Sequence, residues 1–146
     1  MRPKGIRISH DYAEHPGAIP LPATFSMELA RRIGEKGTGM KVRLYSDYPF
    51  PFREDGGPHD DFEREALLFL RGHPDRPFSK LEDMDGRPFL RYAVADRMRP
   101  ACVACHNTHP QSPKKDWKVG DVRGVLEVNR PLDKLLDQTR ASLRDM

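Results

Sequence analysis

The amino-acid sequence predicts a mixed α+β domain with an antiparallel sheet. The expected elements are a helix, a strand, a second helix, a β-hairpin, another strand and a final helix, and the strands gather toward the C-terminal half. The chain has 146 residues, enough for one domain with a substantial core. Hydrophobic residues make up 37% and charged residues 32%, a polar composition that can still fold.

The first third of the chain predicts an extended segment, a helix and a strand. Prolines break residues 1–22, and a helix is expected to begin near Thr24 as its N-cap. Residues 41–48 alternate in polarity, which predicts a strand with Val42 and Leu44 on one face. Either Phe25, Leu29 and Ile33 or Ala30 and Ile33 give this helix an apolar face at helical spacing.

A second helix and a hairpin are predicted in the middle of the chain. Asp60 or Asp61 can cap this helix, and Gly72 ends it. Residues 78–84 and 88–95 predict two strands joined by the hairpin turn Asp85-Gly86. The apolar side of the helix is expected to carry Phe62, Ala66, Phe69 and Leu70. Its polar side is expected to carry Glu63, Arg64 and Arg71.

The C-terminal segment predicts a strand and a helix. Residues 120–129 read as the last strand, and Pro131 can open the final helix. Leucines then form an apolar stripe that suits either the edge of the core or a seam with a partner helix: Leu132, Leu135, Leu136 and Leu143.

Both cysteines of the chain lie in Cys102-Val103-Ala104-Cys105-His106, between the hairpin and the last strand. This Cys-x-x-Cys-His spacing is that of covalent c-type haem attachment. Two thiols three positions apart can form thioether bonds with the two vinyl groups on one porphyrin edge. His106 can then offer a ring nitrogen to the iron as its proximal ligand.

Other readings of this motif are weaker. A redox dithiol is expected in a βαβ context, near the start of a helix that follows a strand. A structural zinc site needs four ligands, and Cys102, Cys105, His106 and His109 would crowd into one short turn. A disulfide across two residues would be small and strained. Metal binding by other means and inert thiols also stay open.

Two further segments suit a flat apolar cofactor. Residues 49–53 form a proline-stiffened aromatic segment that could be the wall of such a cofactor or a cap on the core. The polar loop 107–118 carries Lys114 and Lys115, which could pair with haem propionates or form a solvated face.

Composition excludes some classes of protein. The net charge is only +3, with acidic and basic residues interleaved, which argues against a nucleic-acid-binding domain. No apolar run approaches the ~20 residues of a membrane span. Residues 1–5 carry positive charge, but the apolar segment of a signal peptide does not follow them. If the haem reading holds, we expect an extracytoplasmic, periplasmic location and a targeting or membrane segment outside this chain.

Several segments together resemble the PAS-like c-type haem family, whose members include cyanobacterial haem proteins and the extracytoplasmic sensor parts of histidine kinases and nucleotide cyclases. The similar segments are residues 43–53, 62–66, 91–93, 102–107 and 120–128. The resemblance covers residues 17–131 and looks closest to the branch found ahead of adenylate/guanylate cyclase domains. It leaves residues 1–16 as a lead-in and 132–146 as a connecting helix.

The resemblance implies a PAS-like antiparallel sheet with flanking helices, one covalent haem c and His106 as an iron ligand. Where family members use a cysteine as the sixth ligand this chain has none to spare, since both are in the motif. Met27, from a distant segment, is the leading distal candidate. The alternatives are Met98, His15, His10 and His109, or an open site.

We therefore expect a haem-based sensory domain that responds to redox change or a diatomic gas. Its signal would pass through the terminal helices to an output domain such as a nucleotide cyclase, with homodimer formation possible. The alternative is a small monohaem cytochrome that uses Lys114, Lys115 and Lys118 to dock acidic redox partners. No catalytic motif stands out, so the chain itself is not expected to be an enzyme.

Overall fold

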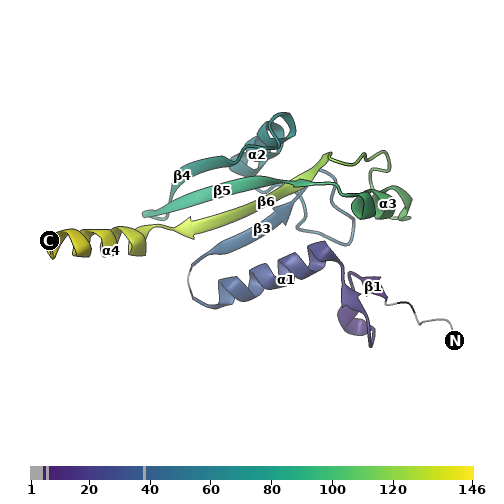
Figure 1. Ribbon diagram of the computed structural model, residues 1–146, viewed down its shortest axis with the longest axis horizontal. Coiled ribbons are helices and arrows are strands. Elements are labelled where there is room, and N and C mark those ends of the chain that lie inside the picture. Colours follow the sequence, from purple (N-terminus) through teal and green to yellow (C-terminus); the bar gives the residue numbers. More distant parts are fainter. Residues whose placement is uncertain (1–4, 6, 38) are drawn as a thin grey trace.

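The computed structural model describes residues 5, 7–37 and 39–146, and its centre is a four-stranded antiparallel sheet (Figure 1). The strand order is β3-β6-β5-β4. The strands are β3 (Lys41–Tyr45), β4 (Phe78–Met84), β5 (Arg87–Arg97) and β6 (Val122–Pro131). With the four helices described below, this arrangement confirms the predicted mixed α+β class.

The hairpin between β4 and β5 forms where the sequence predicts it. Met84 pairs with Arg87, so Asp85 and Gly86 alone make the turn. Both have positive φ angles, 57° and 77°, as a two-residue hairpin turn of this kind requires. A local dipeptide therefore fixes the register of this strand pair.

Two expected boundaries are wrong. The strand predicted for residues 41–48 ends at Tyr45, because Ser46 turns away: its amide donates to the carbonyl of Gly56 at 2.9 Å and its hydroxyl to that of Arg123 at 2.6 Å. Pro131 is the last residue of β6 and does not open the final helix, which is α4 (Asp133–Arg144).

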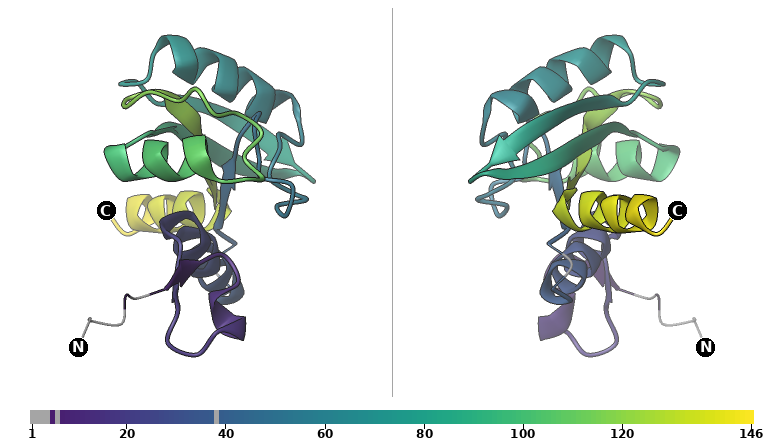
Figure 2. Two further views of the ribbon diagram at one scale, coloured as in Figure 1. Left: turned by 90° about the vertical axis from the view of Figure 1, so that its right-hand side faces the viewer. Right: turned by 90° about the vertical axis from the view of Figure 1, so that its left-hand side faces the viewer.

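Helix α2 (Asp61–Gly72) covers one face of the sheet and forms the core with it (Figure 2). The side chain of Asp60 accepts a hydrogen bond from the amide of Glu63 at 3.0 Å, so the predicted N-cap is confirmed. The buried core consists of Tyr45, Phe62, Ala66, Leu67, Leu70, Ala93 and Val125, with Phe69 packed against it.

Glu63 was expected on the exposed side of α2, and this prediction is wrong. It is only 3% exposed. Its carboxylate accepts from Arg43 Nε at 2.9 Å and from the amide of His59 at 2.6 Å. The partner that makes its burial tolerable lies 20 residues earlier in the chain, on β3, where no helical periodicity can reveal it.

Helix α1 (Pro22–Glu35) lies beside β3 on the other side of the sheet from α2 (Figures 1 and 2). It begins at Pro22 after the N-cap Leu21, so the prediction of Thr24 as N-cap is wrong. Proline suits the first helical position because its ring presets the backbone angle and its missing amide proton is not needed there. None of the helix's residues is fully buried.

The segment before α1 is more ordered than expected. Ile8–Ser9 (β1) pairs in parallel with Ile19–Pro20 (β2), on either side of a short 3-10 helix over Tyr12–Glu14. Residues 1–4, for which the sequence predicts no signal peptide, lie outside the described residues. Within the described part of the chain, no helix has the length and apolar character needed to cross a bilayer.

Candidate functional site

The Cys-x-x-Cys-His motif lies on helix α3 (Pro100–Thr108), not in the loop that was expected. Pro100 occupies the first turn and stabilises a helix directly after β5. Cys102 and Cys105 are both free thiols, the first partly exposed and the second exposed. Helical spacing places positions three apart on one side of the helix. Both thiols can therefore reach the same edge of a bound group.

The imidazole of His106 is partly buried and neutral. Burial, the largest cause, and the positive charge of Arg123 together lower the pKa of His106 to about 4, against an opposing effect of Asp96. Arg123 and Asp96 form an ion pair between β6 and β5 beside the motif. At neutral pH the ring therefore keeps a nitrogen lone pair available for a metal ion.

Aromatic and histidine rings from distant segments surround His106. We call this group the aromatic cluster: His10, Tyr48, Phe50, Phe52, His106, His109 and Trp117. The centroid of Phe50 lies 5.0 Å from that of His106 and 5.1 Å from that of Phe52. The prediction left open whether this aromatic segment lines a cofactor or caps the core. Of its two rings, Phe50 contacts His106 of the motif, and Phe52 contacts His10 and His109.

Asn107 fixes the loop behind the motif, a role that the sequence analysis missed. Its side-chain amide donates to the carbonyl of Trp117 and accepts from the amide of Trp117, both at 2.9 Å. Trp117, 6% exposed, is thereby held 6.5 Å from the ring of His106. The available signal was the position of Asn107 directly after the motif.

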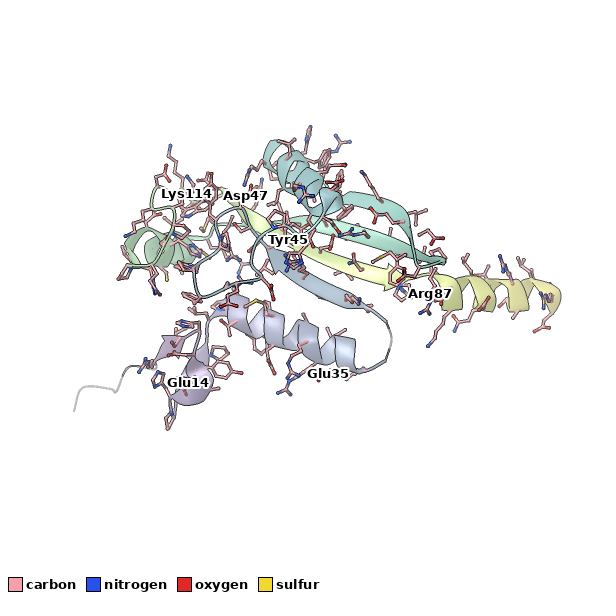
Figure 3. All side chains as sticks on the ribbon, turned by 180° about the vertical axis from the view of Figure 1, so that it is seen from behind. Glu14, Glu35, Tyr45, Asp47, Arg87 and Lys114 are labelled. Carbon is pink, nitrogen blue, oxygen red and sulfur yellow. The ribbon has the colours of Figure 1, made fainter. Side chains whose placement is uncertain are left out.

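Lys114 lies at the same end of the molecule, away from Arg87 at the other end of the sheet (Figure 3). Its ammonium group pairs with Asp116 at 2.6 Å and lies 4.9 Å from the centre of the Trp117 ring. Of the two lysines expected near propionates, this one therefore already has a carboxylate partner, whereas Lys115 is exposed.

The candidate distal ligands occupy different places. His10 stacks on Phe52 at 4.0 Å and His109 lies 5.1 Å from Phe50, so both belong to the aromatic cluster. His15 instead pairs with Asp11 at 3.1 Å. Met98 is 2% exposed, and its backbone bonds to Gly120 and Asp121 tie the end of β5 to the start of β6.

Met27 faces the space between α1 and the sheet. Its sulfur accepts a hydrogen bond from Arg53 Nη2 at 2.6 Å. Both residues line a cavity of about 350 Å³. The other apolar walls are Ala30, Val42, Leu44 and Leu126.

The residues around the motif fit a covalently attached haem. Two accessible thiols, a neutral imidazole and flat apolar walls are what such a group requires of a protein. A porphyrin supplies four ligands of its iron itself, so the chain needs to add only axial ones. Among the described residues, no three His, Cys, Asp or Glu side chains converge as a metal-binding cluster.

Comparison with protein families gives one match. The model of the Tll0287-like family matches residues 3–131, a span that includes α1, the whole sheet and the motif helix. No curated protein sequence matches the chain significantly. Because the family match covers far more than half of the 146 residues, the chain belongs to the Tll0287-like family.

Proposed function

We propose that this chain is a PAS-like sensory domain that carries one covalent haem c and responds to redox change or a diatomic gas. The observation that carries the proposal is helix α3, which places two free thiols beside a neutral, partly buried histidine that touches an aromatic cluster. When bound, the haem would supply one-electron chemistry and gas binding at iron.

Each residue of the motif has a distinct role in this proposal. Cys102 and Cys105 hold the porphyrin edge through thioether bonds, and His106 offers its unprotonated nitrogen to the iron. The rings of Phe50 and Trp117 exclude water from the imidazole. The distal ligand stays open among Met27, Met98, His15, His10 and His109.

The layout of the fold supports signalling from this site. β5 runs directly into the motif helix, and β6 runs from the site end of the sheet to α4 at the opposite end (Figure 1). The ion pair of Asp96 with Arg123 joins β5 and β6 at the site, and that of Arg87 with Asp133 joins β5 to the start of α4 at the other end. An output domain such as a nucleotide cyclase, reached through α4, belongs to the proposal, as do an extracytoplasmic location and homodimer formation.

The test is to produce the protein together with a c-type haem maturation system. We expect haem to stay attached to the denatured chain and to be lost in the Cys102→Ala/Cys105→Ala variant. His106→Ala should keep the thioethers but change the spectrum of the iron. His73→Ala is the matched control, because this exposed histidine stacks on Phe69 away from the motif. A wild-type chain that matures without covalent haem contradicts the proposal.

The spectra also distinguish the mode of sensing. Carbon monoxide binding to the reduced iron would indicate a weak or absent sixth ligand and therefore gas sensing. A reduced spectrum that carbon monoxide leaves unchanged would indicate two strong ligands and favour a redox response. Both are read from the same oxidised, reduced and carbon-monoxide-treated sample.

The second candidate function is electron transfer, favoured by exposed Lys115 and Lys118 in the loop beside the motif. Such a basic patch can dock an acidic redox partner. This function predicts fast electron exchange with a redox partner, at a rate that deletion of residues 132–146 leaves unchanged. A sensory domain instead needs α4 to transmit the state of the haem.

A further inference from the structure

Arg53 is a partly buried cation without a carboxylate partner in the described part of the chain. Its Nη2 donates to the Met27 sulfur at 2.6 Å and to the carbonyl of Leu44 at 3.4 Å. A thioether sulfur is a weak acceptor. Burial and the charges of Arg123 and Arg43 lower the pKa of Arg53, against a smaller opposing effect of Asp96. Asp96 itself pairs with Arg123, so the guanidinium of Arg53 has no ion pair with a carboxylate among the described residues, although a desolvated arginine normally has one.

The neighbouring arginines do not share this feature. Arg43 donates to the Glu63 carboxylate at 2.9 Å and to the carbonyl of Asp55 at 2.7 Å. Arg123 pairs with Asp96. Three arginines thus lie close enough to affect one another, and two already have carboxylates.

The cavity beside Arg53 is mostly apolar. Its apolar floor and wall are formed by β3, β6 and α1, through Val42, Leu126, Met27 and Ala30. The polar residues that line it besides Arg53 are Ser26, Arg43 and Asp55. A flat apolar molecule that bears a carboxylate matches this lining: the body can be buried against the sheet and the carboxylate can meet the cation.

Arg53 also belongs to the same loop as the aromatic cluster. Its amide bonds to the carbonyl of Phe50 at 2.9 Å, closing a tight turn that holds Phe50, Phe52 and Arg53 together. The charge of Arg123 acts on both Arg53 and His106, so both residues lie near it. The loop therefore presents rings toward the motif and a cation toward the cavity.

We propose that Arg53 binds a carboxylate of the haem, a propionate, and anchors the edge of the ring away from the thioether bonds. This inference rests on the proposed haem function. A propionate is a far better acceptor than a thioether, and a guanidinium can hold it with two parallel hydrogen bonds. When Arg53 takes this carboxylate, Met27 loses its hydrogen-bond donor and its sulfur lone pair becomes free.

The test compares the holoprotein with Arg53→Gln, Arg53→Lys and the control Arg32→Gln, an exposed arginine of α1 paired with Glu28. The reduction potential is measured from about pH 5 to about pH 8. In Arg53→Gln the unpaired buried propionate favours the ferric state and has a raised pKa. We expect the reduction potential to fall by ~59 mV, which for one electron corresponds to a tenfold change in the equilibrium constant. We also expect the potential to acquire a new pH dependence. Arg53→Lys should restore most of both properties.

The outcomes separate this inference from the proposed function. Covalent haem in Arg53→Gln with the potential and pH profile of the wild type would overturn the role of Arg53 while the haem function stands. Failure of the wild-type chain to attach haem overturns the haem function itself. If Arg53→Gln does not fold, resonance Raman spectra of the wild-type holoprotein decide: a propionate bending band that is constant over this pH range supports the pairing, and a band that titrates contradicts it.

Discussion

Arg91 and Glu127 lie under α2 as a nearly fully buried ion pair. Arg91 Nη2 donates to Glu127 at 2.9 Å, and the exposed fractions of the two side chains are 5% and 1%. Arg91 Nη1 also pairs with Asp60 at 2.8 Å and with Glu82 at 3.2 Å, so carboxylates outnumber the cation. Burial, the largest cause, and the nearby charges of Glu63 and Asp60 together raise the pKa of Glu127 to about 7, against the attraction of Arg91.

This pKa predicts a pH-dependent stability. Between the ordinary value of 4.5 and about 7 the folded state binds the Glu127 proton more tightly than the unfolded chain does. The free energy of unfolding should therefore fall as pH rises through this window, by up to ~3 kcal/mol at 1.36 kcal/mol per pKa unit. Glu127→Gln removes the titrating group, so urea denaturation at several pH values should show a flatter profile.

The control for this prediction is Glu65→Gln, an exposed glutamate of α2 that pairs with Lys80. The pH dependence of its free energy of unfolding should follow that of the wild type, because an exposed ion pair contributes little to stability. A profile of Glu127→Gln that is parallel to the wild type across the window would show that Glu127 titrates at its ordinary pKa.

At the scale of elements, Asp60 at the start of α2 both caps the helix and pairs with the buried Arg91. Asp60 accepts from the amide of Glu63 through one carboxylate oxygen and from Arg91 through both. Asp60→Ala loses the cap and an ion-pair partner, whereas Asp60→Asn keeps an oxygen that can cap. We expect the alanine variant to lose ~2 kcal/mol of unfolding free energy and the asparagine variant about half of that.

Chemical denaturation of both variants at neutral pH measures the two contributions separately. Equal losses would mean that the pairing of Asp60 with Arg91 dominates and that the cap adds nothing measurable. A loss in the alanine variant alone would assign the whole effect to the cap.

Elements that depend on local chemistry were predictable from the sequence. The Asp60 cap needs only the three residues that follow it, and the Asp85-Gly86 turn needs only its own backbone preferences. The parallel pairing of β1 with β2 depends on contacts between segments with no hydrophobic alternation. The motif helix was missed because its residues show no apolar periodicity, and its start depends on Pro100 after β5.

At the scale of the whole molecule, one part of the candidate site was predictable from the local sequence, and the other part depends on contacts between distant segments. Cys102, Cys105 and His106 could be identified because their spacing is itself the signal. The approach of Phe50 and Trp117 to His106 depends on how two loops close over the end of the sheet. That Arg53 has no ion pair with a carboxylate among the described residues was equally hidden, because a missing counter-ion is recognised only when the neighbours in space are known.

The sheet connects this site with α4, which leads to a prediction about the proposed signal. α4 has no buried residue. Its first turn is joined to β5 by a 3.0 Å hydrogen bond that Arg87 Nε donates to Asp133 Oδ2. If the state of the haem shifts β6 against β5, the amides of β6 and of the first turn of α4 should exchange with deuterium at different rates in the oxidised and reduced holoprotein.

Arg87→Gln should shrink this difference at α4 and leave it at β6, because the variant cuts the link only after the strand. Arg71→Gln, which removes an exposed pair with Asp47, is the matched control and should keep both differences. The measurement is hydrogen–deuterium exchange followed by mass spectrometry of peptides that cover residues 122–144. Identical exchange in the two oxidation states of a fully haem-loaded protein would rule out transmission along this route, and electron transfer would then be the better account of the domain.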